Sequence, residues 1–195
     1  MSLKYYEHNA DQFFKDTVNV DMSELYQPFV NHIKNHGRVL DAGCGSGRDT
    51  KAFIDMGFTV DAFDSSREMV KLATNFTGIN VKCKSFDDID ADNKYDGIWA
   101  CASLLHVPEA ELLNVFIKME RALAEQGVWY MSFKYGDTQR EKEGRVFTDL
   151  NEQKLHELIV SCESLKRLNA WVTRDKRPDK NEKWLNALVT KVPVV

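Results

Sequence analysis

The sequence of 195 residues lacks the features of metal-binding and disulfide-stabilised proteins. Its four cysteines, at positions 44, 83, 101 and 162, form no C-x-x-C pair and no Cys/His spacing of a zinc site. Such a pattern indicates neither a metal centre nor a disulfide framework. We therefore expect four reduced thiols, no bound metal and a cytoplasmic location.

Long hydrophobic runs are also missing. The first fifteen residues carry polar and charged groups throughout, so they do not have the pattern of a signal peptide. The longest mostly apolar run, residues 97–108, has about twelve residues, whereas a membrane span needs about 18 or more. We expect a soluble protein that has no membrane partner.

An excess of positive charge is a third absence. The formal net charge is −4, which provides no general attraction for the phosphates of a nucleic acid. With 43% hydrophobic residues, the chain has the composition of a globular protein, and its length predicts one domain. The composition carries no signal for an oligomeric state.

The hydrophobic residues alternate between strand-like runs and helical spacing, which is typical of an α/β domain. Strands are expected at residues 38–42, 59–63, 79–83, 95–101, 127–133, 165–173 and 184–192. Helices are expected at residues 25–33, at 48–56, from a capping box of Ser65 and Glu68, from Pro108, and at 155–162. Residues 135–148 are expected to form a polar loop.

The last two strands have no crossover helix between them, so they must pair antiparallel. The expected fold is therefore a doubly wound, mostly parallel seven-stranded sheet with an antiparallel C-terminal hairpin. Helices cover both faces of this sheet, and a helical cap precedes it.

A glycine-rich loop joins the first strand to a helix in the segment Val39-Leu-Asp-Ala-Gly-Cys-Gly-Ser-Gly-Arg48. Backbone N–H groups in such a loop can hold an anionic group of a nucleotide-like ligand. A dinucleotide motif would need a third glycine where Arg48 or Thr50 stands, which makes a nicotinamide cofactor the weaker interpretation. Asp64 ends the second strand, where a carboxylate can accept hydrogen bonds from both hydroxyls of a ribose.

These motifs resemble those of the class I S-adenosylmethionine-dependent methyltransferases. The first motif of that family has the form D/E-x-G-x-G-x-G, and an acidic residue ends its second strand. Further matches are Phe86-Asp87-Asp88, Tyr95-Asp96 and the segment 122–128, in which Gln126 replaces a glycine. More loosely, residues 5–22 and 103–108 resemble small-molecule methyltransferases of the tellurite-resistance type.

The resemblance implies S-adenosylmethionine as the cofactor and assigns its contacts. Loop residues would line the methionine part, Asp64 would bind the ribose, and the segments near 65–69 and 86–87 would flank the adenosine. Residues 100–103 would underlie the sulfonium. The implied cofactor residues are Asp41, Gly43, Cys44, Gly45, Asp64, Ser65, Met69, Phe86, Asp87, Ala100, Cys101 and Ser103. Ser85 stands where the family often has an acidic residue, so the adenine contact there is expected to fall to backbone and Asp87.

Candidate acceptor residues come from the later part of the chain. Four of them follow the fifth strand or lie in the terminal hairpin, and two or three cations there could hold an anionic acceptor: Lys134, Tyr135, Arg145 and Arg174. His106 is a candidate general base, with the alternative that it only orients its loop. The aromatic pairs at 5–6 and 13–14 are either a lid over the cofactor or a hydrophobic staple.

The expected division is a cap at residues 1–36, a cofactor-binding core at 37–134, and an acceptor loop, helix and hairpin at 135–195. The function expected is methyl transfer by in-line displacement to a small acceptor, which is anionic if the candidate cations converge on the site and neutral if they do not. A methylsulfonium is an activated donor, so the protein mainly needs to align the reactants and exclude water. The alternatives are a non-catalytic S-adenosylmethionine-binding sensor or partner protein and, less favoured, a nicotinamide-dependent reductase.

Overall fold

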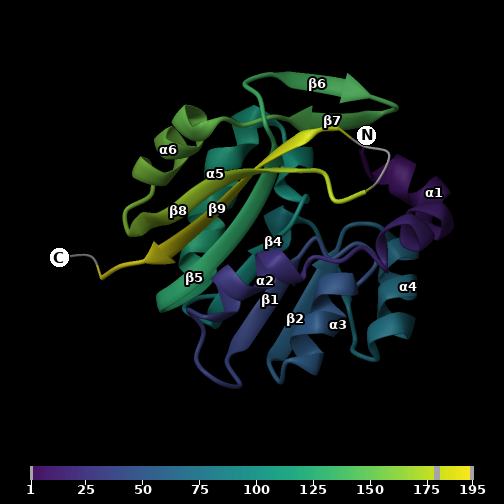
Figure 1. Cartoon of the computed structure of the whole chain (residues 1–195), viewed down its shortest axis with the longest axis horizontal. Helices are drawn as coiled ribbons and strands as arrows, with labels where there is room; N and C mark the ends of the chain where they lie inside the picture. The colour runs from purple at the N-terminus through teal and green to yellow at the C-terminus, as the bar shows by residue number, and fades with distance from the viewer. Residues whose placement is uncertain (1, 178–180, 194–195) are drawn as a thin grey trace.

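The computed structural model describes residues 2–177 and 181–193, and its centre is a seven-stranded sheet in the order β3-β2-β1-β4-β5-β9-β8 (Figure 1). The strands of this sheet are β1 (Arg38–Ala42), β2 (Thr59–Asp64), β3 (Lys82–Cys83), β4 (Tyr95–Ala100), β5 (Leu123–Lys134), β8 (Leu165–Arg174) and β9 (Lys183–Lys191). Strands β1 to β5 are parallel, and β9 runs antiparallel to both of its neighbours. This arrangement confirms the expected fold class.

Helices cover both faces of the sheet. They are α1 (Ser2–Thr17), α2 (Ser23–Val30), α3 (Arg48–Asp55), α4 (Arg67–Thr77), α5 (Glu109–Ala122) and α6 (Glu152–Val160). On one face, Phe29 of α2 and Phe53 of α3 pack on Trp99 of β4. None of the helices among the described residues is long and apolar enough to cross a membrane.

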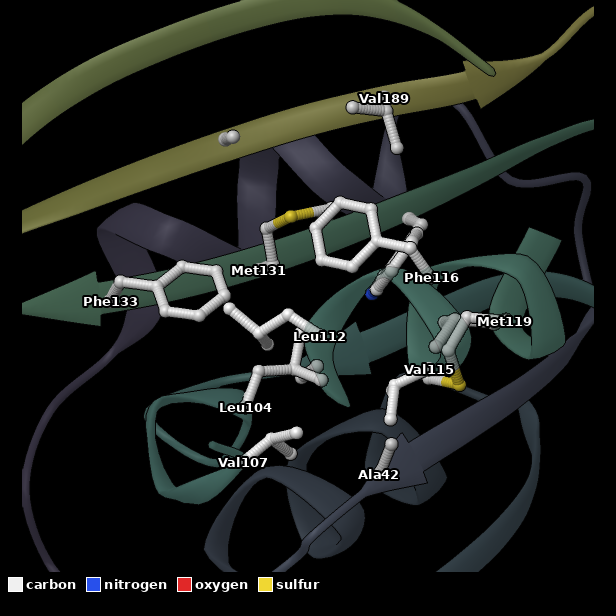
Figure 2. Close-up of a cluster of buried hydrophobic side chains, with 14 of the residues drawn as sticks. Ala42, Leu104, Val107, Leu112, Val115, Phe116, Met119, Met131, Phe133 and Val189 are labelled. Carbon is white, nitrogen blue, oxygen red and sulfur yellow. The ribbon is translucent and has the colours of Figure 1, made fainter. Parts of the chain in front are cut away.

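The larger hydrophobic core lies on the opposite face, between the sheet and helices α5 and α6. In Figure 2 the side chains of Leu112 and Phe116 on α5 lie beside Phe133 and Met131 of β5, and Val115 of α5 points toward Ala42 of β1. Every second residue of the central strands points to this face because successive side chains of a strand alternate. The core therefore fixes the strands whose carboxyl ends carry the candidate site.

Segment 135–148, expected as a polar loop, instead contains a separate hairpin of β6 (Gln139–Lys142) and β7 (Arg145–Thr148). Lys142 pairs with Arg145, so the turn has two residues, Glu143 and Gly144. Both have positive φ, 54° and 69°, as a type I′ hairpin turn requires. All four residues of β6, Gln-Arg-Glu-Lys, are polar, so the sequence shows no alternation there.

The cap of α4 and the bounds of β3 and β5 also differ from the expectation. Ser66, not Ser65, caps α4, because its Oγ accepts a hydrogen bond from the backbone N–H of Met69 at 3.3 Å. The third strand covers only Lys82–Cys83, at the edge of the sheet, where β2 is its one partner in the described sheet. Strand β5 begins at Leu123, directly after α5, before Gly127 is reached.

Candidate active site

A cavity of about 980 Å³ opens at the carboxyl ends of the parallel strands. Open α/β sheets bind ligands at this edge. One half of the cavity is lined by the glycine loop and the residues that follow β2 and β3, and we call it the cofactor half. The other half is lined by α1, β7 and the facing ends of β5, β8 and β9, and we call it the acceptor half.

Gly43 shapes the floor of the cofactor half. Its φ is +77°, and a Cβ at this position would lie 2.5 Å from the Cβ of Ser103. Ser103 is held in place because its Oγ donates a hydrogen bond to the carbonyl of Ala42 at 2.7 Å. The backbone N–H of Gly43 donates to the carbonyl of Phe63 at 3.0 Å. We call this part of the floor, formed by Gly43 and Gly45, the cradle. Only glycine at position 43 leaves it open, as a closely approaching ligand requires.

Asp64 stands at the edge of the cradle with its carboxylate fixed by backbone. One oxygen accepts a hydrogen bond from Gly45 N–H and the other from Ser66 N–H, each at 2.9 Å. Burial raises the pKa of this carboxyl group, although both N–H groups act in the opposite direction. A carboxylate has about four acceptor positions, so two are available for the hydroxyls of a ribose.

Asp49 forms a buried polar cluster beneath the loop that sequence reasoning missed. It accepts hydrogen bonds from Tyr26 at 2.6 Å, from the indole of Trp99 at 2.8 Å, and from Arg48 at 2.6 and 2.9 Å. Burial alone would raise the pKa of Asp49, but the Arg48 guanidinium and these hydrogen bonds lower it. The available signal was a charged pair directly after the last glycine of the loop.

Two residues implied as cofactor contacts do not line the cavity. Asp41 is buried below the loop, where it accepts a hydrogen bond from the Thr50 hydroxyl at 2.6 Å. Burial is the largest cause and the charge of Asp49 the second, and together they raise the pKa of Asp41 to about 8. Ala100 is fully buried in β4. Both expectations are corrected. Asp41 and Ala100 lie at the ends of strands β1 and β4, beneath the loop, and support it from the side away from the cavity.

The other implied cofactor residues all line the cavity: Gly43, Cys44, Gly45, Asp64, Ser65, Met69, Phe86, Asp87, Cys101 and Ser103. The ring of Phe86 meets that of Phe63 edge to face at 5.4 Å, which forms an apolar wall. Asp87 pairs with Lys118 of α5 at 3.3 Å. Ser85, where the family often has an acidic residue, also lines the cavity, and its N–H donates to Asp88.

Three of the four acceptor candidates reach the acceptor half: Lys134, Arg145 and Arg174. Lys134 pairs with Glu182, and its ammonium lies 4.6 Å from the ring centre of Phe147. The guanidinium of Arg145 stacks 3.8 Å from the ring centre of Tyr5 and pairs with Glu143 at 2.6 Å. Phe147 was missed because its strand was expected to be a loop.

Tyr135 lies outside the cavity, which corrects the expectation for this residue. It is 42% exposed, and its hydroxyl donates a hydrogen bond to Glu152 of α6 at 2.9 Å. Side chains alternate along an extended segment, so the position after Lys134 points away from the site.

His106 lies at the junction of the two halves, within a short 3₁₀ helix at Leu104–His106. Its Nε2 is 2.7 Å from the hydroxyl of Tyr6, and its Nδ1 is 2.8 Å from the carbonyl of Val146. Burial lowers the pKa of His106 to about 4, with the charges of Arg145 and Lys134 acting in the same direction. The side chain is therefore a neutral imidazole near pH 7.

The aromatic residues of α1 divide between two environments. Tyr5, Tyr6 and Phe13 line the cavity, and a Cβ on Gly45 would lie 3.4 Å from Phe13. Phe14 instead meets Phe76 of α4, with ring centres 5.8 Å apart. Helix α1 is thus docked on α4 by one side and faces the ligand site with the other.

Parts of this chain are similar in sequence to known methyltransferases. Residues 39–127 match a family model described as a methyltransferase domain. An uncharacterized methyltransferase of Staphylococcus carnosus is 29% identical over 119 residues, which are 57% of this chain and 58% of that protein. A ubiquinone biosynthesis O-methyltransferase of Xanthomonas campestris is 32% identical over 79 residues, which are 37% and 33% of the two chains. The chain thus spans about a third to somewhat over half of these relatives' lengths.

Solved structures include the 1,6-didemethyltoxoflavin-N1-methyltransferase of Burkholderia thailandensis, bound to 1,6-didemethyltoxoflavin and S-adenosylhomocysteine. This structure superposes on the present chain with a TM-score of 0.79 and 21% sequence identity, and the match covers 97% of the present chain and 85% of the Burkholderia chain. At this identity the likeness shows the fold, and it extends beyond the matched domain to α1 and the C-terminal strands.

Proposed function

We propose that this chain is an S-adenosylmethionine-dependent methyltransferase and that it methylates a small acceptor that carries a negative charge. The observation that supports this proposal is the continuation of one cavity from the glycine loop into the acceptor half. Its volume of about 980 Å³ is at the upper end of the usual range for small-molecule sites. A cofactor and a small second substrate would fit together.

The cations on the wall of the acceptor half support a negative charge on the acceptor, and two of them already pair with carboxylates that line the same cavity, Lys134 with Glu182 and Arg145 with Glu143. Lys134, Arg145 and Arg174 line the acceptor half. The Nε of Arg145 is buried and, among residues 2–177 and 181–193, has no hydrogen-bond partner. A buried donor without a partner is costly, so a ligand that accepts from it would gain a charge-assisted hydrogen bond.

The residues of the chain have simple tasks in this reaction. Gly43, Gly45 and Asp64 would hold the cofactor, which when bound would supply a methyl group activated by a sulfonium. Lys134 and Arg145 would orient the acceptor, and the rings of Tyr6, Phe13 and other α1 aromatics would exclude water. Alignment of this kind can provide most of the catalysis that a methyl transfer needs.

Two kinds of acceptor are consistent with such a pocket. The resemblance of residues 5–22 and 103–108 to the tellurite-resistance type favours a small oxyanion. The toxoflavin and ubiquinone enzymes are instead named for a nitrogen acceptor and an O-methylation. We also propose the division of the chain given above, with residues 1–36 as a helical cap, 37–134 as the cofactor-binding core and 135–195 as the acceptor loop, last helix and hairpin.

Calorimetry with S-adenosylmethionine and S-adenosylhomocysteine tests the proposal. We expect one molecule of either ligand to bind per chain and no binding of NAD(H). The absence of heat and of a thermal shift at millimolar ligand would refute the assignment. Release of S-adenosylhomocysteine with a panel of acceptors then distinguishes an enzyme from a sensor that only binds the cofactor.

A further inference from the structure

We infer that Tyr6 receives the proton released by the methyl acceptor, that His106 acts through Tyr6, and that the acceptor therefore carries an O–H or N–H nucleophile in addition to its anionic group. This inference rests on the proposed function and names its acceptor class. It excludes a bare soft anion, such as a chalcogen oxyanion or a thiolate, as the principal acceptor.

The direction of the hydrogen bonds follows from the carbonyl of Val146. A carbonyl oxygen only accepts, so the His106 nitrogen that lies 2.8 Å from it, Nδ1, carries the hydrogen. The other nitrogen, Nε2, therefore has a free lone pair, and the Tyr6 hydroxyl donates to it at 2.7 Å. The hydroxyl oxygen of Tyr6 has two lone pairs: Arg145 faces it as a donor, and the other lone pair is left for a donor in the cavity.

The pair stands where the two halves of the cavity meet. The backbone N–H of His106 donates to the carbonyl of Ser103 at 3.1 Å, and Ser103 is the residue against which Gly43 packs. From the other side, the ring of Tyr6 meets that of Phe13, which lies over Gly45, at 5.1 Å. Tyr6 and His106 both line the cavity.

The charged and titratable groups around the pair keep both side chains neutral. Arg145 of β7 and Lys134 of β5 face His106, whereas Arg145, Asp64 and Tyr5 face Tyr6. Burial raises the pKa of Tyr6 to about 12, although Arg145 opposes this shift. A neutral phenol that donates to a neutral imidazole can pass one proton inward and take another from a ligand.

The proton transfer balances as follows. The X–H bond of the acceptor breaks as X bonds to the methyl carbon, and the electron pair of the methyl–sulfur bond stays on the sulfur. The proton from X moves to the oxygen of Tyr6, while the proton of Tyr6 moves to Nε2 of His106. The imidazolium keeps its Nδ1–H bond to the Val146 carbonyl and later releases a proton to water.

This arrangement favours one acceptor class over another. A thiolate or an oxyanion has no proton to lose, so it would gain nothing from a hydroxyl backed by an imidazole. Lys134 and Arg145 lie on the β5 and β7 side of the cavity and can hold a separate anionic group of the same molecule. The site therefore fits a small molecule with an anionic end and a protonated oxygen or nitrogen.

Two variants test the relay. Tyr6→Phe removes only the hydroxyl, and His106→Gln keeps an amide that can accept from Tyr6 and donate to Val146 but cannot take a proton. The matched controls are Tyr135→Phe and His156→Gln, both exposed and both outside the cavity. The probes are a phenol with a carboxylate, an N–H heterocycle with a carboxylate, 3-mercaptopropionate and tellurite, each with S-adenosylmethionine.

We expect wild type to methylate a phenol or N–H probe, and Tyr6→Phe and His106→Gln to lower kcat for it about 100-fold at pH 7. KM should change little, the loss should shrink at high pH where the probe ionises in solution, and both controls should behave as wild type. The proposal is overturned if only the thiol or tellurite reacts, if no O–H or N–H probe reacts, or if both variants retain kcat. An equal loss with the thiol would also overturn it, because that result indicates a merely structural role.

Nitrogen-15 NMR of labelled histidine provides a readout that needs no cofactor. We expect His106 to be neutral with its proton on Nδ1 at pH 7, and Tyr6→Phe to shift the Nε2 resonance. A proton on Nε2 would overturn the relay. If the chain binds no S-adenosylmethionine, the proposed function fails, whereas the tautomer measurement still judges the relay itself.

Discussion

The cofactor half and the acceptor half of the cavity are built in different ways. The cofactor half depends on backbone: Gly43 and Gly45 form its floor, and two N–H groups hold the carboxylate of Asp64. The acceptor half depends on side chains from distant segments, such as Tyr6 of α1 and Arg145 of β7. The floor of the first and its carboxylate Asp64 are encoded within about 27 neighbouring residues of the sequence, from 38 to 64, whereas the second is formed only by the folded chain.

This difference has a functional meaning. A backbone cradle tolerates few substitutions because any Cβ at its glycines changes the floor, so it suits a ligand that stays the same. A wall of side chains changes with single substitutions, so it suits a substrate that differs between relatives. Damage to the cofactor half should therefore affect folding and cofactor binding, whereas damage to the acceptor half should affect only the second substrate.

The largest effect is expected for Asp49→Asn. The amide would leave the charge of Arg48 buried without its partner and would turn an N–H toward the donors Tyr26 and Trp99. Breaking a buried pair of this kind costs about 3–5 kcal/mol in the free energy of unfolding. Urea denaturation measures it.

Asp55→Asn is the matched control, because Asp55 forms an exposed pair with Lys51 one turn away, worth about 0.5 kcal/mol or less. The low pKa of Asp49 also fixes the sign of a pH effect. Its contribution is complete above about pH 4, the ordinary pKa of aspartate, and is lost as the pH falls through the lower folded value. The difference in the free energy of unfolding between wild type and Asp49→Asn should therefore become smaller in acid. An equal difference at all pH values would contradict this account.

Gly43→Ala should have the next largest effect. Its φ of +77° costs about 1–3 kcal/mol for a residue with a Cβ, and that Cβ would also displace Ser103. Affinity for S-adenosylmethionine, measured by calorimetry, should be lost. Gly78→Ala is an unusually close control, because Gly78 has the same φ and nothing within 4 Å of an added Cβ. If both variants bind equally well, the cradle is not as tight as described.

The sequence predicted the cofactor half well because its signals are local. Asp64 and the glycines of the loop were placed by the spacing of one strand, one turn and one helix, and the structure puts them in one cavity. Asp41 was misplaced because a motif does not tell which side of a loop a side chain takes. Asp49 was missed because its partners Tyr26 and Trp99 come from α2 and β4, which only folding brings together.

The acceptor half could be predicted only in outline. The end of β5 indicated Lys134, but the alternation of side chains that excludes Tyr135 depends on where the strand ends. The hairpin β6–β7 was missed since all four residues of β6 are polar and show no alternation. The contact between Tyr6 and His106 joins residues 100 positions apart, and no local pattern contains it.

Asp64→Ala is expected to act on binding more than on folding. It removes two acceptor positions for ribose hydroxyls, and hydrogen bonds to a charged acceptor are worth about 1.5–3 kcal/mol. The dissociation constant for S-adenosylmethionine, measured by calorimetry, should rise by the factor that corresponds to this loss of binding free energy. Asp61→Ala on the same strand is the control, since Asp61 pairs with Lys94 and Arg38 outside the cavity. An unchanged dissociation constant for Asp64→Ala would remove Asp64 from the cofactor site.

The smallest effect, and the one that isolates the acceptor half, is expected for Arg145→Ala. Its guanidinium stacks on Tyr5 and is mostly covered, with 16% of the side chain exposed, so it would bind the anionic end of the acceptor through charge-assisted hydrogen bonds. Because this end does not react, loss of the contact itself is expected to raise KM. We expect KM for the acceptor to rise about tenfold, equivalent to about 1.4 kcal/mol, with the affinity for S-adenosylmethionine unchanged. Arg145 also faces Tyr6 and His106, so any change in kcat reports on the proton relay and is measured separately. The control is Arg167→Ala on β8, an exposed arginine outside the cavity. A loss of cofactor affinity in Arg145→Ala would show that the two halves are not independent, and unchanged acceptor kinetics would make a neutral acceptor the better interpretation.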